Sequence, residues 1–445
     1  MRHWTAVKRA SAAMGLALVA GLASAAIPIE HWVHPSGTRV YLVNSPTIPM
    51  VDVQMDFDGG SRREPAAQAG LANAAAGLLD GGVGAYEGQP ARDENALAAA
   101  WVDLGAEFGA SAGSDRFSVQ LRSLTDPAIL SRAVALAAQQ LARPTWPEAV
   151  WQRDRERATA ALREALNRPP TVAGHAFGRA VYGEHPYGRF ATPETLAAIR
   201  VDDMRAFYRR HVSACRAQVV MVGAMDRAGA ERIVDALVRA IAPNGCAELP
   251  IVPEVQPLAA PTEQRLPMPA AQAQVLMGQP GFKRDDPDFF PLFVGNHILG
   301  GSGFTSRLTI EVREKRGLTY GVYSYFSPGR HAGAFQIGLN TRPDQADEAV
   351  RVVRETLAAY IAGGPTEAEL QAAKDYLING FALRFDSNRK LLDNVVNIAW
   401  NGLPLDYLDT WTQRVRALTA DEVRRAMQRV VKPDRMATVI VGAKP

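Results

Sequence analysis

The 445-residue sequence contains only two cysteines, Cys215 and Cys246, and eight histidines scattered along the chain. Two thiols cannot build a disulfide-dense scaffold or a four-cysteine zinc site, although an oxidising compartment allows them one disulfide. The sequence leaves that bond open, because it does not give the distance between the two residues. It also contains no H-E-x-x-H, no H-x-x-E-H, no G-x-S-x-G elbow and no phosphate-binding P-loop. An active peptidase with an unrecognised nucleophile is therefore the least supported function.

Long hydrophobic runs are missing as well, with one exception near the N-terminus. Residues 13–22 are apolar but too few to span a bilayer, and Arg2, Lys8 and Arg9 precede them. Ala-Ser-Ala at residues 23–25 then provides an A-x-A cleavage site. The pattern predicts a signal peptide over residues 1–25 and a periplasmic or otherwise exported mature chain without an integral membrane span. A retained signal anchor is the alternative, and the small residues after the apolar run argue against it.

An excess of one charge is also lacking. The full chain has 49 Lys and Arg against 46 Asp and Glu, and residues 1–25 hold three of the basic residues. The mature chain is therefore near neutral, and no basic block indicates binding to nucleic acid or to an anionic membrane. With 47% hydrophobic and 21% charged residues, the composition is that of a folded globular protein. The length corresponds to two to four domains.

What the sequence does contain is an internal repeat. The alternating strand pattern of residues 117–121 returns at residues 335–339, which is 218 positions later. The apolar run of residues 219–224 returns at residues 438–443, 219 positions later. Each of the first pair precedes an Ala-rich helical run. The sequence thus predicts an α+β fold with two homologous lobes, each an antiparallel-rich sheet covered on one side by helices.

A proline-rich stretch separates the two repeats. Residues 243–272 contain seven prolines, which favour an extended, hinge-like chain because proline fixes φ and lacks an N–H. We therefore expect an N-terminal lobe over residues 27–242, a linker over residues 243–272, and a C-terminal lobe over residues 273–445.

Near the start of the first lobe, a strand (51–57), a polar loop (59–64) containing Gly-Ser-Arg, and a buried Ala- and Leu-rich helix (70–79) follow one another. This order resembles the pitrilysin (M16, insulinase-like) peptidase family, whose bacterial two-lobed chains have a duplicated fold of the LuxS/MPP-like metallohydrolase type. In that family the helix carries H-x-x-E-H, where two histidines on one helix face bind Zn²⁺ and the Glu takes a proton from the metal-bound water.

This chain departs from the family pattern at all three of these positions. Asn73 stands at the first His, Ala76 at the Glu and Gly77 at the second His. None of the three can replace the lost ligands or the base, so we expect no metal site in this chain. Glu164 lies near the place of the family's third ligand, and we expect it to be a solvated helix residue. His185, in a loop similar to one of the bacterial members, is expected to be a structural hydrogen-bonding residue rather than a catalyst.

The second lobe keeps its motif. A Gly-rich stretch (299–308) leads to a short helix, for which Ser306 is a possible cap and Gly317 the residue after its end. Residues 313–320 read R-x-x-x-G-L-x-Y and closely resemble the family's second-lobe signature. The resemblance implies that Arg313 and Tyr320 bind the substrate carbonyl and stabilise the tetrahedral intermediate, as good donors to an oxyanion. We expect Gly301, Ser302, Gly303 and Phe304 to contact the substrate. A solvated Arg beside a core Tyr is the simpler alternative.

The loss of one motif beside the retention of the other suggests the function. We expect a non-catalytic subunit of a heterodimeric zinc metallopeptidase, whose partner is a homologue that carries H-x-x-E-H and the zinc. Substrates are expected to be short or unfolded peptides, bound as an added strand at a sheet edge. The alternative is a proteolytically inactive protein of this family that binds peptides or scaffolds a complex.

Overall fold

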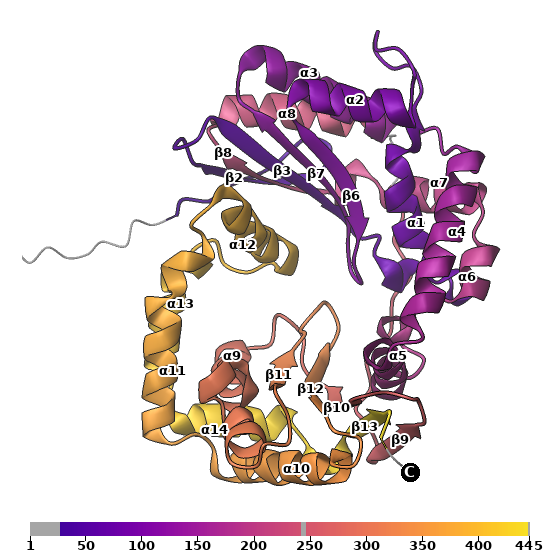
Figure 1. Ribbon diagram of the computed structural model, residues 1–445. Helices are drawn as coiled ribbons and strands as arrows, with labels where there is room; N and C mark the ends of the chain where they lie inside the picture. Colours follow the sequence, from indigo (N-terminus) through magenta and orange to yellow (C-terminus); the bar gives the residue numbers. More distant parts are fainter. Residues whose placement is uncertain (1–26, 242–245, 444–445) are drawn as a thin grey trace, which may run out of the picture.

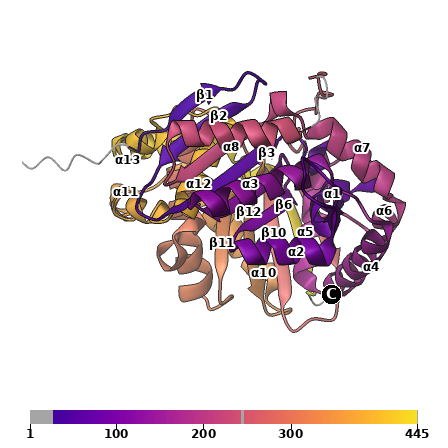
Figure 2. The same ribbon diagram turned by 90° about the horizontal axis from the view of Figure 1, so that it is seen from above.

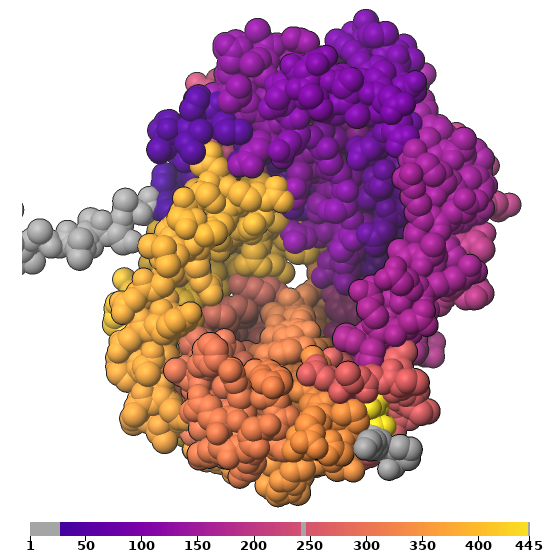
Figure 3. All heavy atoms as spheres, viewed as in Figure 1, coloured from indigo at the N-terminus to yellow at the C-terminus, as the bar shows by residue number. Residues whose placement is uncertain are grey.

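The computed structural model of the chain describes residues 27–241 and 246–443, so the expected signal peptide lies outside the described residues. Two lobes stand opposite each other, with the first lobe at the top of Figure 1 and the second at the bottom. A hollow remains between them in the space-filling view (Figure 3).

The first lobe is built on a six-stranded sheet of order β1-β2-β8-β3-β7-β6. Short β-branched and apolar runs form its centre, where β3 and β8 are almost completely buried. Its strands are β1 (Glu30–Val33), β2 (Arg39–Asn44), β3 (Met50–Phe57), β6 (Glu107–Ala112), β7 (Phe117–Leu124) and β8 (Gln218–Gly223), and β4 (Gly82–Val83) and β5 (Arg92–Asp93) form a separate small hairpin.

The second lobe is built on a five-stranded sheet of order β11-β12-β10-β13-β9. Its strands are β9 (Thr262–Leu266), β10 (Ala273–Pro280), β11 (Val322–Phe326), β12 (Ala334–Thr341) and β13 (Ala437–Val441). Read from its other edge, this order matches β2-β8-β3-β7-β6, and each sheet has a single parallel pair, β2 with β8 or β9 with β13. The predicted duplication into two antiparallel-rich α+β lobes is confirmed.

The helices follow the same repeat. In the first lobe they are α1 (Leu71–Gly77), α2 (Glu94–Leu104), α3 (Pro127–Ala142), α4 (Glu148–Ala165), α5 (Pro169–Tyr182), α6 (Pro193–Ala198), α7 (Val201–His211) and α8 (Arg227–Ala240). In the second they are α9 (Phe289–Asn296), α10 (Ala346–Gly363), α11 (Glu367–Asn379), α12 (Asn388–Asn401), α13 (Tyr407–Ala417) and α14 (Ala420–Val430). Helices α3 and α10 begin 219 residues apart, and so do α5 and α12. None of the helices in the described part is both long and apolar enough to cross a membrane.

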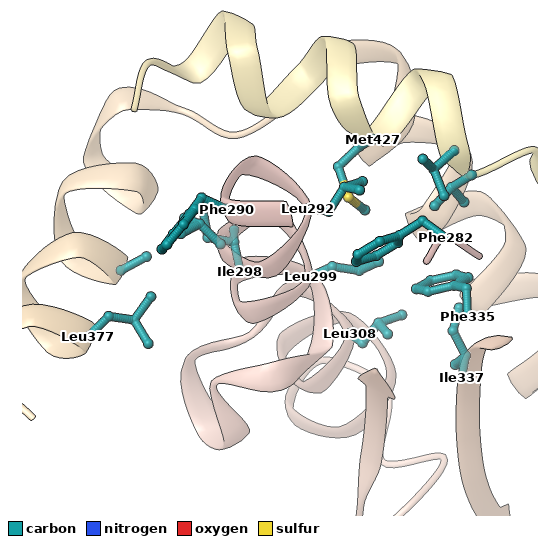
Figure 4. Packing of buried hydrophobic residues seen from close by; sticks show 14 of the residues in the cluster. Phe282, Phe290, Leu292, Ile298, Leu299, Leu308, Phe335, Ile337, Leu377 and Met427 are labelled. Atoms are coloured by element: carbon teal, nitrogen blue, oxygen red, sulfur yellow. The ribbon is translucent and has the colours of Figure 1, made fainter. Parts of the chain in front are cut away.

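Helices cover the outer face of each sheet, as expected. Figure 2 shows α3 and α8 lying across the first sheet, and Figure 1 places α10 and α14 beneath the second. Phe282 and Phe335 lie close together in the core of the second lobe, and Met427 of α14 packs nearby (Figure 4). The cores are formed by residues such as Val219, Met221, Ile337 and Leu357, all of which are at most 1% exposed.

The inner face of each sheet corrects the expectation that helices cover one side only. Helix α12, from the second half of the chain, packs on β8 and β3 of the first sheet. Helix α5, from the first half, packs on β10 and β13 of the second sheet. Each half of the chain thus contributes one helix to the inner face of the other lobe's sheet. A sheet with apolar residues on both faces needs to be covered on both faces. The two lobes are joined by this exchange as well as by the linker.

The linker itself differs in part from the expectation. Residues 262–266 of the proline-rich stretch form β9, the edge strand of the second sheet. Prolines stand at both ends of this strand, Pro261 and Pro267, and none lies inside it, so its N–H groups remain free to pair. The second sheet therefore begins before residue 273.

The two cysteines form the disulfide that the sequence left open. Cys215 and Cys246 are bonded, with their Cα atoms 6.2 Å apart. Cys215 directly precedes β8, and Cys246 lies in the linker, so the bond fastens the start of the linker to the first lobe.

Candidate functional site

Helix α1 occupies the place where the family would carry its metal. Glu64 holds the start of the helix, because its carboxylate accepts hydrogen bonds from the N–H groups of Gly70 and Ala72, both at 2.9 Å. Burial raises the pKa of Glu64, while these N–H groups act in the opposite direction. The framework of the helix is therefore intact, although its functional positions have changed.

The three changed positions cannot hold a metal ion. Asn73 and Gly77 are exposed on the open side of α1, and Ala76 is buried. Asn73 and Gly77 border a 360 Å³ cavity between α1 and α4, whose walls are mostly apolar. It is lined by Gly70, Asn73, Ala74, Gly77, Leu78, Trp151, Asp154, Ala158, Leu162, Ala191 and Leu196. The residues that remain are unsuited to Zn²⁺, which needs three or four His, Cys or carboxylate ligands.

The acidic residues of α4 do not replace them. Asp154 lines the cavity but pairs with Arg153 at 2.8 Å, and Glu164 is exposed, as expected, and does not line the cavity. Among residues 27–241 and 246–443, no group of three or more His, Cys, Asp or Glu side chains lies close enough together to bind a metal.

Strand β6, which the sequence analysis did not single out, lies beside α1 and forms an edge of the first sheet. It pairs with β7 on one side, and no described strand pairs with its other edge. Its sequence, Glu-Phe-Gly-Ala-Ser-Ala, is dominated by small residues, so the backbone is accessible to an added chain. This segment lacks an alternation of apolar and polar residues, and the strand was therefore not predicted.

The second-lobe motif lies in a π-helical segment, Thr309–Glu314, and the loop after it. Lys315 and Arg316 both pair with Glu311, at 2.7 and 2.8 Å. Arg313 forms no salt bridge with a described residue, and its guanidinium lies 4.8 Å from the centre of the Phe304 ring. Gly317 follows the segment with φ of +62°, as expected for the residue that ends a helix.

Tyr320 is directed into open space, with 87% of its surface exposed. Phe304 is also largely exposed, at 68%. Shortly after Tyr320 in the sequence, Tyr323 and Tyr325 of β11 have stacked rings and are exposed as well. Tyr320 is therefore not a core residue, which argues against the alternative of a solvated Arg beside a core Tyr. The structure brings Arg313 and Phe304 into contact, and Gly301, Gly303 and Tyr320 are exposed.

Close packing fixes the Gly-rich stretch against β11. A Cβ on Gly300 would lie 2.6 Å from the backbone nitrogen of Ser324, so only glycine fits there. Asn296 accepts a hydrogen bond from the Ser324 hydroxyl at 2.8 Å and donates one to its carbonyl at 3.0 Å. The segment that carries the expected substrate contacts is thus held by backbone packing rather than left as a free loop.

Between the lobes lies a polar cavity of 640 Å³. Helix α12 contributes Asn397, Trp400 and Asn401 to its wall, and the first sheet contributes Gln54 and Gln120. The Trp400 ring has one guanidinium from each lobe near it, Arg116 at 5.5 Å and Arg330 at 5.0 Å. Side-chain amides of this kind can donate to and accept from a peptide backbone, and guanidinium groups can donate to it.

Segments of both lobes meet beside this cavity. Asp115 accepts hydrogen bonds from Arg62 at 2.9 Å, from the Tyr187 hydroxyl at 2.6 Å, and from the Arg330 N–H at 3.1 Å. His185 is buried here, accepts a hydrogen bond from the Tyr187 N–H, and stacks edge-on against His331 of the second lobe. It has the structural role that was expected.

Comparisons with known proteins agree with this geometry. A family model described as the peptidase M16 inactive domain matches residues 198–377. The solved structure of a peptidase M16 inactive domain from Pseudomonas fluorescens superposes with a TM-score of 0.87 and is 31% identical, covering 94% of this chain and 98% of that one. The chain belongs to the peptidase M16 family and is related to its inactive domains.

Two further relatives show how this chain compares in length. An uncharacterized zinc protease of Streptomyces coelicolor is 30% identical over 280 residues, and the match spans 60% of this chain and 59% of that protein. The periplasmic protease PqqL of Escherichia coli has the same fold, with a TM-score of 0.78 and 17% identity. That match covers 94% of this chain but 45% of the PqqL chain.

Proposed function

We propose that this chain is the non-catalytic subunit of a heterodimeric M16 zinc metallopeptidase. The observation that carries the proposal is the contrast between the two lobes. The metal positions hold Asn73, Ala76 and Gly77, whereas Arg313 and Tyr320 are kept. Among the described residues, Arg313 has no salt-bridge partner, and the ring of Tyr320 is exposed. The partner chain carries H-x-x-E-H and the zinc.

In the complex, Arg313 and Tyr320 donate hydrogen bonds to the carbonyl oxygen of the scissile peptide bond. A guanidinium and a phenol hydroxyl are suited to this role, because both stabilise negative charge as it develops on that oxygen. Gly301, Ser302, Gly303 and Phe304 border the same surface and contact the peptide. The match to 45% of the PqqL chain supports the need for a second unit, since that protease is about twice as long as the part that this chain matches.

The substrates are short or unfolded peptides. The free edge of β6 supports their binding as an added strand, and the 640 Å³ cavity beside it supplies polar side chains. The Cys215–Cys246 disulfide supports an exported, periplasmic location, because such bonds persist in oxidising compartments.

The test begins with purification of the tagged mature chain from its native periplasm and mass spectrometry of the proteins that accompany it. We expect a stoichiometric homologue with H-x-x-E-H, and zinc and peptidase activity in the complex only. In that complex, Arg313→Ala is expected to lower kcat/KM by about 100-fold, the size of effect seen when one oxyanion donor is lost.

Arg316→Ala is the matched control, since it removes a guanidinium three residues away that pairs with Glu311. Its kcat/KM is expected to stay within about twofold of the unmodified complex, because surface ion pairs contribute little. Unchanged kcat/KM in the Arg313→Ala complex would contradict the catalytic part of the proposal.

A second candidate is a peptide-binding or scaffolding protein that acts without a peptidase partner. The apolar lining of the cavity beside Asn73 and Gly77 favours it, because such a wall suits an apolar side chain of a ligand better than a metal ion. Recovery of the chain alone, or as a metal-free homodimer, would support this second function.

A further inference from the structure

A separate cavity of 390 Å³ lies in the second lobe, between α9, β11, α12 and α13. In Figure 1, α13 lies at the left, α12 lies under the first sheet, and α9 and β11 lie nearer the centre. Eight aromatic rings and two arginines contribute to the wall. The lining consists of Phe282, Arg284, Phe289, Phe293, Asn296, Tyr325, Phe326, Pro328, Phe381, Arg384, Asn394, Asn397, Tyr407, Leu408 and Trp411.

Arg284 is a buried cation in this wall, with only 7% of its surface exposed. Its guanidinium lies 3.7 Å from the centre of the Phe289 ring and donates one hydrogen bond, to the Tyr407 hydroxyl at 2.9 Å. No carboxylate in the described part of the chain forms a salt bridge with it. Of the acidic residues that follow it in sequence, Asp286 and Asp288 pair with Arg429 instead, and Asp285 is exposed.

Arg384 contributes a second guanidinium at the more open side of the same cavity. It lies 5.0 Å from the Trp411 ring and 5.5 Å from the Phe293 ring, and it too lacks a carboxylate partner among the described residues. Two guanidinium groups without a carboxylate partner among the described residues therefore line one cavity. A buried cation is costly unless an anion joins it.

We infer that this cavity binds the C-terminal residue of a peptide, with the α-carboxylate at Arg284 and Arg384 and an apolar or aromatic side chain against the rings. Guanidinium groups bind carboxylates with paired, charge-assisted hydrogen bonds. The aromatic wall gives the side chain an apolar contact, and 390 Å³ is enough for one or two residues.

The position of the cavity favours a peptide end over a free small acid. Pro328 and Asn397 line both this cavity and the polar cavity between the lobes, so the two spaces adjoin. A peptide in the central cavity can therefore place its last residue here. The choice of a peptide rests on the proposed function, whereas the preference for an apolar carboxylate rests on this cavity alone.

The test uses the full mature chain without any partner, so it does not depend on peptidase activity. Calorimetry would compare N-acetyl-L-phenylalanine with N-acetyl-L-phenylalaninamide, and a hexapeptide ending in Phe with its C-terminally amidated form. We expect each free acid to bind at least tenfold more tightly than its amide, and the acid hexapeptide more tightly than N-acetyl-L-phenylalanine. Equal affinities of acid and amide, or no binding of the acids at millimolar concentration, would overturn the carboxylate site.

Two exposed arginines provide the variants. Arg384→Gln removes a guanidinium from the cavity and is expected to reduce the preference for the acid to threefold or less. Arg414→Gln is the matched control, because Arg414 lies over the Phe290 ring, 5.6 Å from its centre, and does not line the cavity. An unchanged preference in Arg384→Gln would place the carboxylate elsewhere. Binding of the small acid without binding of the acid peptide would exclude a peptide end as the ligand.

Discussion

His185 and His211 are buried residues whose charge is set by their surroundings. Burial lowers the pKa of each to about 4 from the usual value of 6.5. The positive charges of Arg189 and of a protonated His331 also lower the pKa of His185, whereas the negative charge of Glu254 raises it. Both histidines are therefore neutral in the folded protein at physiological pH.

The lowered pKa of His185 predicts that the folded protein loses stability in acid. The folded pKa of His185 lies below its unfolded value, so its contribution to stability is complete above about pH 6.5 and is lost as the pH falls toward 4. We expect the urea midpoint of the unmodified chain to fall over this window, and the fall to be shallower in His185→Asn. Parallel pH profiles for the two proteins would contradict the assignment. Tryptophan fluorescence during urea unfolding at a series of pH values provides the measurement.

At this scale, what the sequence could reveal depended on whether a site is contiguous. Arg313 and Tyr320 stand seven residues apart within one motif, so the sequence could identify them as a pair. Arg284 and Arg384 are a hundred residues apart, and only the fold brings both to one cavity. The vacated metal positions were equally readable, because Asn73, Ala76 and Gly77 lie within one helix.

Among the elements, the Gly-rich stretch depends on its close contact with β11. Gly300→Ala would place a methyl group 2.4 Å from the Ser324 hydroxyl oxygen and 2.6 Å from its backbone nitrogen. Such overpacking costs about 1–3 kcal/mol, and we expect a Tm lower by several degrees. Gly363→Ala in α10 is the control, since a methyl there meets no atom within 4 Å. Calorimetry of both variants tests this, and equal Tm values would contradict the packing argument.

The exchanged helix α12 predicts an effect across the lobes. Leu392 is 1% exposed on α12, and replacing it with alanine should cost about 2–5 kcal/mol. We expect hydrogen exchange to accelerate in β3 and β8, although these strands belong to the first half of the chain.

Leu357→Ala in α10 is the matched control for this effect. Leu357 is equally buried, and its loss should accelerate exchange in the second sheet only. Acceleration confined to the second lobe in both variants would show that α12 does not stabilise the first sheet.

At the scale of the elements, the repeat allowed the strands to be predicted, but it did not predict that α5 and α12 pack on the sheet of the opposite lobe. The pattern at residues 117–121 and 335–339 became β7 and β12, and the apolar runs before the two Gly-Ala pairs became β8 and β13. The apolar stripe of α5 or α12 indicates that the helix is buried, but it does not indicate which sheet the helix packs on. Strand β6 was missed because small residues carry no periodic signal, and β9 because prolines surround it.

For the whole molecule, the disulfide ties the linker to the first lobe. The bond closes residues 31 positions apart, and a loop of this size corresponds to about 3–4 kcal/mol of stabilisation in the chain-entropy description. Cys215→Ser with Cys246→Ser should lower the free energy of unfolding by about this amount at neutral pH. Denaturant unfolding with and without reductant provides the measurement, and no effect of reductant on the unmodified chain would contradict it. Free-thiol titration of the unmodified chain should find no reactive thiol.

The exchange of helices also imposes an order on biosynthesis. The last strand of the first sheet ends at Gly223, whereas the helix that covers its inner face begins at Asn388. A growing chain therefore completes every strand of that sheet more than 160 residues before the cover for Val43, Val220 and Val222 exists. The first lobe cannot reach its final packing while it emerges, so nearly the entire polypeptide must be made and kept from aggregating before either lobe is finished. The first sheet therefore stays incompletely covered until the last third of the chain is available.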